Sequence, residues 1–242
     1  MRQAVAANSN APAMRHRGRE RTYSTAELTQ IILHACLVAR DAAFNVGNLL
    51  SSSSGMAVLA VKECEYDLDS YERLIDEEIP AAITQVDEIQ ARQLLSCLKF
   101  ITDLERIGDL MLWVAQCAQR FHPKLERRDT APLLKMGLTL EQMLDTTHTA
   151  FVSRDAVLAQ SVIKADRQID EVRQALFRKH LQQTARQNPT RTINLLLMAQ
   201  AFERAGDHAK NLGEELVHLF EGHSMRHAST EDKKRGRNLS EL

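Results

Sequence analysis

Cysteine, aromatic residues, glycine and proline are all scarce in this 242-residue chain, and each shortage excludes a class of protein. The 4 cysteines lie far apart and form no C-x-x-C pair. We therefore expect reduced core thiols in a cytoplasmic protein and no disulfide framework. Aromatic residues make up 5% of the chain, beside 9 glycines and 5 prolines. This composition argues against a β-rich fold, because such folds use aromatic and turn residues heavily.

Long apolar runs and an excess of charge of one sign are also missing. No segment approaches the ~20 apolar residues that span a bilayer, and the N-terminal segment has no apolar core of a secretory signal. The 31 Lys and Arg residues nearly balance the 32 Asp and Glu residues, which argues against a protein that coats nucleic acid or an anionic membrane. We expect a cytoplasmic protein that binds no nucleic acid and is peripheral to a membrane at most.

The sequence does contain the apolar periodicity of long helices. Ser24 and Glu27 have the spacing of a capping box, in which each side chain accepts a hydrogen bond from the other residue's backbone N–H. Six helices are predicted, beginning near Ser24, Gly55, Glu88, Asp129, Asp155 and Thr190. Asp129 and Thr130 are candidates to cap the fourth helix, and Pro80 is expected to bend or end the second. No alternating strand pattern is long enough to compete, so the fold class is all-α.

The two halves of the chain resemble each other. The segment LERIGD at 104–109 recurs as FERAGD at 202–207, and in each half an acidic helix precedes it. The simplest architecture is a duplicated three-helix bundle with pseudo-two-fold symmetry. The expected division is a flexible Arg-rich arm at 1–22, a first repeat at 23–122, a second repeat at 123–222 and a disordered tail at 223–242.

Pairs of acidic residues four apart are the most informative feature of the repeats. The four pairs are Glu65/Asp69, Glu105/Asp109, Asp166/Asp170 and Glu203/Asp207. Residues four apart share one face of a helix, so each pair directs two carboxylates to one region. Leu98 and Ile101 precede Glu105 on the same face, which places these acids at a partly buried seam. Burying several carboxylates is expensive, and bound multivalent cations are the usual remedy.

Two further residue types adjoin these pairs. Gly108 and Gly206 lie inside the predicted helices, where glycine costs ~1 kcal/mol relative to alanine, so they indicate close helix approach or room for a ligand. Asn211 follows Asp207 by four residues and extends its row, whereas Trp113 takes that place in the first half. If metal binds, the site in the second half is expected to have more ligands than the site in the first half. Oxygen donors without cysteine favour iron, manganese or magnesium over a structural zinc.

Other interpretations of the acid pairs stay open. Arg106 and Arg204 can neutralise them as ordinary surface charges, in which case the bundles are structural adaptors. The acids can also belong to a metal-dependent carboxylate-cluster enzyme or an iron-storage bundle, although the Glu-x-x-His motif of di-iron proteins is missing from these helices. A P-loop, a dinucleotide fingerprint and a G-x-S-x-G motif are missing as well. We therefore expect a regulator without enzymatic activity.

The segments TDLERIGDLMLWVAQ and AQAFERAGDHAKNLGEE, each preceded by acid-x-x-Ile/Leu-Asp, resemble the PhoU family of phosphate-uptake regulators over about 24–222. The resemblance implies two three-helix repeats and a homodimer. It implies multinuclear metal sites, with iron expected first and manganese, magnesium or zinc as alternatives. It also implies negative regulation of phosphate uptake and of phosphate-starvation two-component signalling. The implied partners are a phosphate-specific ABC transporter ATPase and a phosphate-sensor histidine kinase. The implied metal ligands are Glu65, Asp69, Glu105, Asp109, Asp166, Asp170, Glu203, Asp207 and Asn211.

Overall fold

The computed structural model describes residues 23–52, 55–120, 127–182 and 189–221, and nearly all of them are helical. These described residues form six α-helices, which are α1 (Thr25–Ser52), α2 (Gly55–Ala82), α3 (Glu88–Gln119), α4 (Arg127–Ser153), α5 (Ala156–Gln182) and α6 (Pro189–Glu221). A short 3-10 helix, Ile83–Gln85, follows α2. These described ranges contain no strand, and the predicted all-α class is confirmed. The predicted arm and tail lie outside the described residues.

Several helix ends are fixed by polar side chains, as the sequence predicted for the first. Ser24 Oγ accepts a hydrogen bond from the Glu27 backbone N–H at 3.3 Å, and the Glu27 carboxylate accepts one from the Ser24 N–H at 3.0 Å. The capping box at the start of α1 is therefore confirmed. Asp155 caps α5 in a similar way, because its carboxylate accepts the Val157 N–H at 2.8 Å.

The start of α4 differs from the expectation. The helix begins at Arg127, so Asp129 lies inside its first turn and does not cap it. Asp129 is buried and accepts a hydrogen bond from the Arg191 guanidinium of α6 at 3.1 Å. A buried carboxylate is tolerated when it has such a partner. Pro80 lies inside α2, and the helix continues for two more residues and ends at Ala82.

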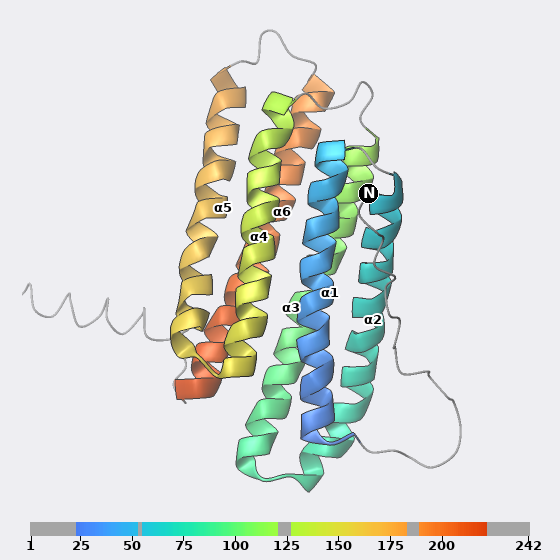
Figure 1. The fold of residues 1–242 in the computed structure, drawn as a ribbon, viewed down its shortest axis with the longest axis vertical. Helices are drawn as coiled ribbons and strands as arrows, with labels where there is room; N and C mark the ends of the chain where they lie inside the picture. The colour runs from blue at the N-terminus through green and yellow to red at the C-terminus, as the bar shows by residue number, and fades with distance from the viewer. Residues whose placement is uncertain (1–22, 53–54, 121–126, 183–188, 222–242) are drawn as a thin grey trace, which may run out of the picture.

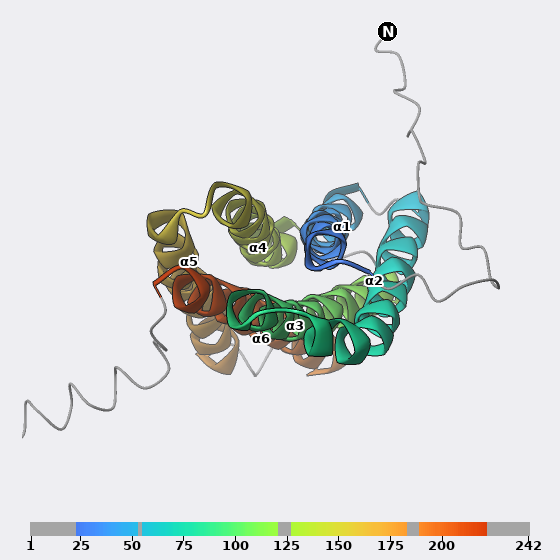
Figure 2. The same ribbon diagram turned by 90° about the horizontal axis from the view of Figure 1, so that it is seen from below.

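The helices pack in two layers (Figures 1 and 2). The order α2, α3, α6, α5 forms a curved layer, and α1 and α4 lie side by side against it. Each repeat supplies one helix of the small layer and two of the large one, and the repeats meet along α1–α4 and α3–α6. Fully buried side chains such as Phe100, Phe202, Leu28 and Leu104 form one continuous core. The second and third helices of each repeat therefore lie next to each other in the large layer.

Glycine lets these neighbouring helices approach closely. A Cβ atom on Gly108 would lie 2.6 Å from Leu68 Cδ1, and one on Gly206 would lie 2.9 Å from Ile169 Cδ1. Leu68 and Ile169 are fully buried, so neither has free space to move into. Close packing thus accounts for both glycines, a point that the sequence left open.

Candidate functional site

The acids of the first repeat face one another across the contact between α2 and α3. Burial raises the pKa of Glu65, and the charges of Asp109 and Asp69 raise it further. Burial also raises the pKa of Glu105, to about 7, and Asp109 is the next largest cause. Carboxylates on α2 and α3 therefore lie close enough to repel one another. This agrees with the prediction that each pair directs its two carboxylates to one region.

Glu105 is the most constrained of these acids. Its side chain is 15% exposed, and its Oε2 atom is buried and accepts no hydrogen bond. The ion pair from this oxygen to Arg106 Nε spans 3.5 Å, and the Arg106 side chain is itself 56% exposed. A buried carboxylate oxygen without a hydrogen-bond donor is costly, and it has a lone pair free to bind a cation.

Glu72 is a fifth acid of this group that the sequence analysis missed. Burial raises its pKa, and its charge in turn raises the pKa of Glu105. Glu72 follows Asp69 by three residues and Glu65 by seven, so the helical period places all three on one face. That spacing was the available signal, but a search for acids that recur in both halves excludes Glu72, because its counterpart in the second half is Arg173.

The second repeat holds its acids in a different way. Lys210 Nζ donates a hydrogen bond to Asp166 Oδ2 at 3.2 Å, and the Asp166 side chain is only 6% exposed. Arg173 Nε lies 3.5 Å from Glu203 Oε1, and Gln200 donates a hydrogen bond to Glu203 Oε2. Burial raises the pKa of both acids, while Lys210 lowers that of Asp166 and Arg173 lowers that of Glu203.

The other two predicted acids of this repeat, Asp170 and Asp207, interact electrostatically with Asp166 and Glu203. Their charges raise the pKa of Asp166 and of Glu203. The charges of the predicted acids of α5 and α6 therefore interact across the two helices, as those of α2 and α3 do. The structure brings the pairs together within each repeat.

Asn211, the ninth predicted ligand, makes a contact between the repeats. Its Nδ2 donates a hydrogen bond to Asp103 Oδ1 at 3.3 Å, and His208 Nδ1 lies 2.8 Å from the same oxygen. Asp103 belongs to α3 and was not singled out in the sequence. Its role depends on how α3 and α6 pair, which no local pattern encodes. The assignment of Asn211 as a metal ligand stays a prediction.

Two features of the acid groups bear on whether they can bind a metal ion, and they point in opposite directions. In the described ranges, no three Asp, Glu, His or Cys side chains are gathered closely enough to hold one ion. Glu105 Oε2, which accepts no hydrogen bond, and the all-oxygen donor set do suit a hard cation such as Fe³⁺, Mn²⁺ or Mg²⁺. The metal and the nine ligands therefore stay predictions, and Glu72 joins them as a neighbour.

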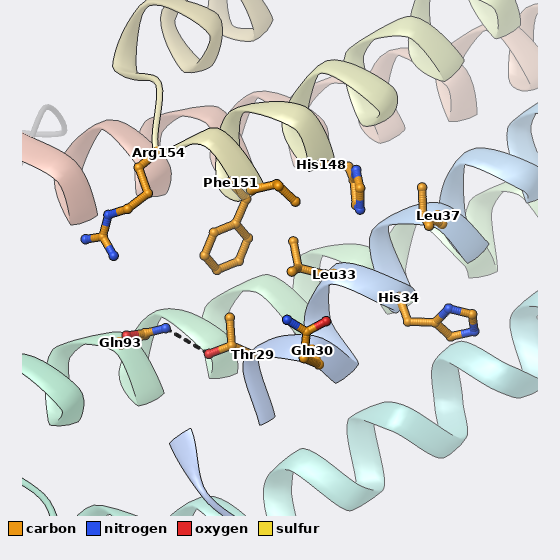
Figure 3. A pocket seen from close by; sticks show the side chains of 10 residues that line it. Thr29, Gln30, Leu33, His34, Leu37, Gln93, His148, Phe151 and Arg154 are labelled. Atoms are coloured by element: carbon orange, nitrogen blue, oxygen red, sulfur yellow. Dashed lines mark hydrogen bonds between the residues drawn. The ribbon is translucent and has the colours of Figure 1, made fainter. Parts of the chain in front are cut away.

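A cavity of about 480 Å³ lies elsewhere, where α1, α3 and the end of α4 meet. Figure 3 shows side chains of α1 and α4 pointing toward each other across it. Its polar lining residues are Thr29, Gln30, His34, Gln93, His148 and Arg154, and burial lowers the pKa of His148. None of the predicted metal ligands lines this cavity, so it is separate from the acid groups.

The four cysteines are free, and Cys36 and Cys97 are buried while Cys64 and Cys117 are half-buried. Burial raises the pKa of the Cys36 thiol to about 12, which makes it unreactive. Across the described ranges, no helix combines the length and apolar character needed to cross a membrane.

The fold and the acid groups define an all-α protein of two three-helix repeats, each with facing carboxylates on its second and third helices. The family model described as PhoU domain matches the chain twice, at residues 33–118 and 133–216. The chain therefore belongs to the PhoU family, as the sequence motifs predicted.

Curated relatives of this family are about a third identical to this chain over the aligned residues. A PhoU homolog of Pseudomonas aeruginosa is 30% identical over 197 residues, covering 79% of this chain and 81% of the relative. PhoU homolog 1 of Thermotoga maritima is 35% identical over 176 residues, covering 69% and 75%. Both are named phosphate-specific transport system accessory proteins. These names describe accessory proteins and not enzymes, which agrees with the expected class.

Two crystal structures share the fold. PhoU from Pseudomonas aeruginosa superimposes with a TM-score of 0.72 at 24% identity, covering 82% of this chain and 97% of the other. PhoU from Streptococcus pneumoniae, described as a phosphate transport system regulatory protein, superimposes with a TM-score of 0.75 at 23% identity. It covers 83% of this chain and 97% of the other. At these identities the likeness concerns the fold alone.

Proposed function

We propose that this chain is a negative regulator of phosphate uptake and of phosphate-starvation two-component signalling. It acts through contacts with a phosphate-specific ABC transporter ATPase and a phosphate-sensor histidine kinase, in the cytoplasm and as a homodimer. The observation that carries the proposal is the double match to the PhoU domain, together with relatives named for a phosphate transport system. A role as an accessory protein in phosphate transport follows from these matches.

Metal binding is the second part of the proposal. The acids of each repeat are the candidate ligands, and the carboxylate donors favour iron, manganese or magnesium. A bound ion would supply positive charge that offsets the repulsion between these carboxylates. Burial is the main cause of the raised pKa values of Glu65 and Glu105, and repulsion from the neighbouring carboxylates raises them further. The neutralised face is then able to contact a protein partner without an unpaired buried charge.

Deletion of the gene in its native host tests the regulatory role. We expect higher phosphate uptake and expression of phosphate-starvation genes in phosphate-rich medium, both restored by the wild-type chain. Affinity purification from the restored strain is expected to recover the transporter ATPase and the sensor kinase. Unchanged uptake and signalling after deletion, with neither partner recovered, would contradict the proposal.

A further inference from the structure

We infer that one end of the helical bundle is a docking surface for an anionic phospholipid bilayer, because the described side chains there carry a large excess of positive charge. At this end α1, α3 and α5 finish, and α2, α4 and α6 begin. We call it the basic end, and its exposed or half-buried basic residues are Lys62, Arg120, Arg127, Arg128, Arg178 and Lys179. The inference goes beyond the proposed function and does not depend on it.

The overall charge balance of the chain conceals a separation of charge along the helices. We compare the eight helical positions nearest each end, together with any described residue directly beyond them. Among these residues, the basic end has seven Lys or Arg residues and a single acid, Asp129. The opposite end has ten acids and two Arg residues. The alternating direction of the six helices gathers these segments at two ends of the molecule (Figure 1).

The one described acid at the basic end is already neutralised. Asp129 accepts a hydrogen bond from the Arg191 guanidinium at 3.1 Å, and its side chain is only 10% exposed. The neighbouring Arg128 side chain is 65% exposed. Asp129 therefore presents no negative charge to an approaching surface, whereas Arg128 presents a positive one.

Side chains, and not helix dipoles, set the sign of the basic end. Three helix C-termini and three helix N-termini meet there, so the partial charges of the dipoles offset one another. The shortest helices have 27 residues, which separates the two ends by about 40 Å at a rise of about 1.5 Å per residue. Because this exceeds the Debye length of about 8 Å several times, the distant acids do not cancel the field at the basic end.

The distribution of the charges favours a planar partner. The six basic residues belong to α2, α3, α4 and α5 and to both repeats. Packed helices lie about 8–10 Å apart, so these charges cover an extended face and not one pocket. A layer of anionic headgroups contacts all of them at once, and each Lys or Arg near such a surface contributes about fivefold in affinity. Bound in this way, the chain directs its acidic end away from the like-charged bilayer.

Co-sedimentation of the full chain with sucrose-loaded vesicles tests the inference. The vesicles contain phosphatidylcholine alone, or phosphatidylcholine mixed with the anionic lipid phosphatidylglycerol. We expect binding only to the anionic vesicles, and weaker binding as the salt concentration rises. The variant Arg120→Gln/Arg127→Gln/Arg178→Gln is expected to bind them about 100-fold more weakly than wild type.

A matched control removes three exposed basic residues from other parts of the chain. Arg92→Gln/Lys164→Gln/Arg167→Gln changes the net charge by the same amount but leaves the basic end intact. It is expected to bind within about threefold of wild type, because these residues lie beyond a Debye length from the bilayer. Circular dichroism confirms that each variant is folded before binding is measured.

A second control separates the basic end from an effect of net charge. Asp76→Asn/Glu77→Gln/Glu88→Gln makes the opposite end less acidic, and we expect it to bind within about threefold of wild type. Stronger binding by this variant, together with equal losses in the two variants that lack basic residues, would overturn the inference.

Three other results would also overturn it. These are equal binding to neutral and anionic vesicles, no binding to anionic vesicles at low salt, and retention on duplex DNA without binding to vesicles. The last result would assign the basic end to nucleic acid. None of these results bears on the regulatory role, which is tested by deletion.

Discussion

The Glu105 carboxyl group is where charge is tolerated least well in the first repeat. Burial is the main cause of its raised pKa, and Asp109 and Glu72 add to it. Because the folded-state pKa of about 7 exceeds the ordinary value of 4.5, protonation stabilises the folded state. This stability is fully present below about pH 4.5 and is lost as the pH rises through about 7.

A pH-dependent stability of the metal-free chain follows. We expect Glu105→Gln to unfold at a higher temperature than wild type at pH 8, by about 1–3 kcal/mol in stability, and to differ little at pH 5. The neutral amide has no charge to desolvate, so the difference grows as the wild-type group ionises. Thermal unfolding of chelator-treated protein between pH 5 and pH 8 measures it.

The control for this series is Glu171→Gln. Glu171 is 62% exposed and pairs with Arg167 on the surface, so its loss is expected to change stability by less than about 0.5 kcal/mol at either pH. Parallel curves for wild type and Glu105→Gln across the whole range would show that Glu105 is not the group that titrates.

At the scale of helices, the close approach of α2 to α3 depends on the missing side chain of Gly108. We expect Gly108→Ala to destabilise the protein by about 1–2 kcal/mol, because its Cβ would lie 2.6 Å from the buried Leu68 Cδ1. The higher helix propensity of alanine, worth about 1 kcal/mol, only partly offsets this clash. Urea unfolding monitored by circular dichroism measures the change.

Gly47 provides the matched control for this substitution. It also lies inside a helix, α1, but a Cβ atom there would meet no atom within 4 Å. Gly47→Ala is therefore expected to stabilise the protein by up to about 1 kcal/mol. A stabilising effect of both substitutions would mean that α2 and α3 separate at little cost, and the packing argument would fail.

At the scale of the whole molecule, a buried polar contact joins the two repeats across α3 and α6. Ser96 Oγ donates a hydrogen bond to Glu215 Oε1 at 2.8 Å, and Lys99 Nζ lies 2.9 Å from Glu215 Oε2. The Glu215 side chain is 7% exposed. Because both partners come from the first repeat, this carboxylate holds the repeats in one relative position.

Glu215→Ala is expected to destabilise the protein by about 2–3 kcal/mol, because it removes the ion pair and leaves buried Ser96 without its acceptor. Glu88→Ala, which removes a surface pair with Arg92, is the control and is expected to cost less than about 0.5 kcal/mol. Urea unfolding compares the two variants. Similar small losses in both would show that the contact contributes little to joining the repeats.

The fold was predictable because its signals are local. The capping box of Ser24 and Glu27 and the apolar period of the helices depend on residues within a few positions of one another, and both were confirmed. The repeated motifs around Gly108 and Gly206 then predicted two copies of one bundle, as the family match shows. The role of Asp129 was predicted wrongly because the residue looks like a local helix cap in the sequence. In the structure its partner is Arg191, which lies far away in the sequence on α6.

The sequence by itself determined the six helices, their duplication and the helix faces that carry the acid pairs, because helical geometry converts spacing directly into orientation. Only the tertiary structure decided which groups meet across helices. Lys210 reaches Asp166, Arg173 reaches Glu203, and the Glu105 oxygen has no donor. These differences between the two acid groups depend on the rotation and offset of neighbouring helices, which are set by packing over the whole core.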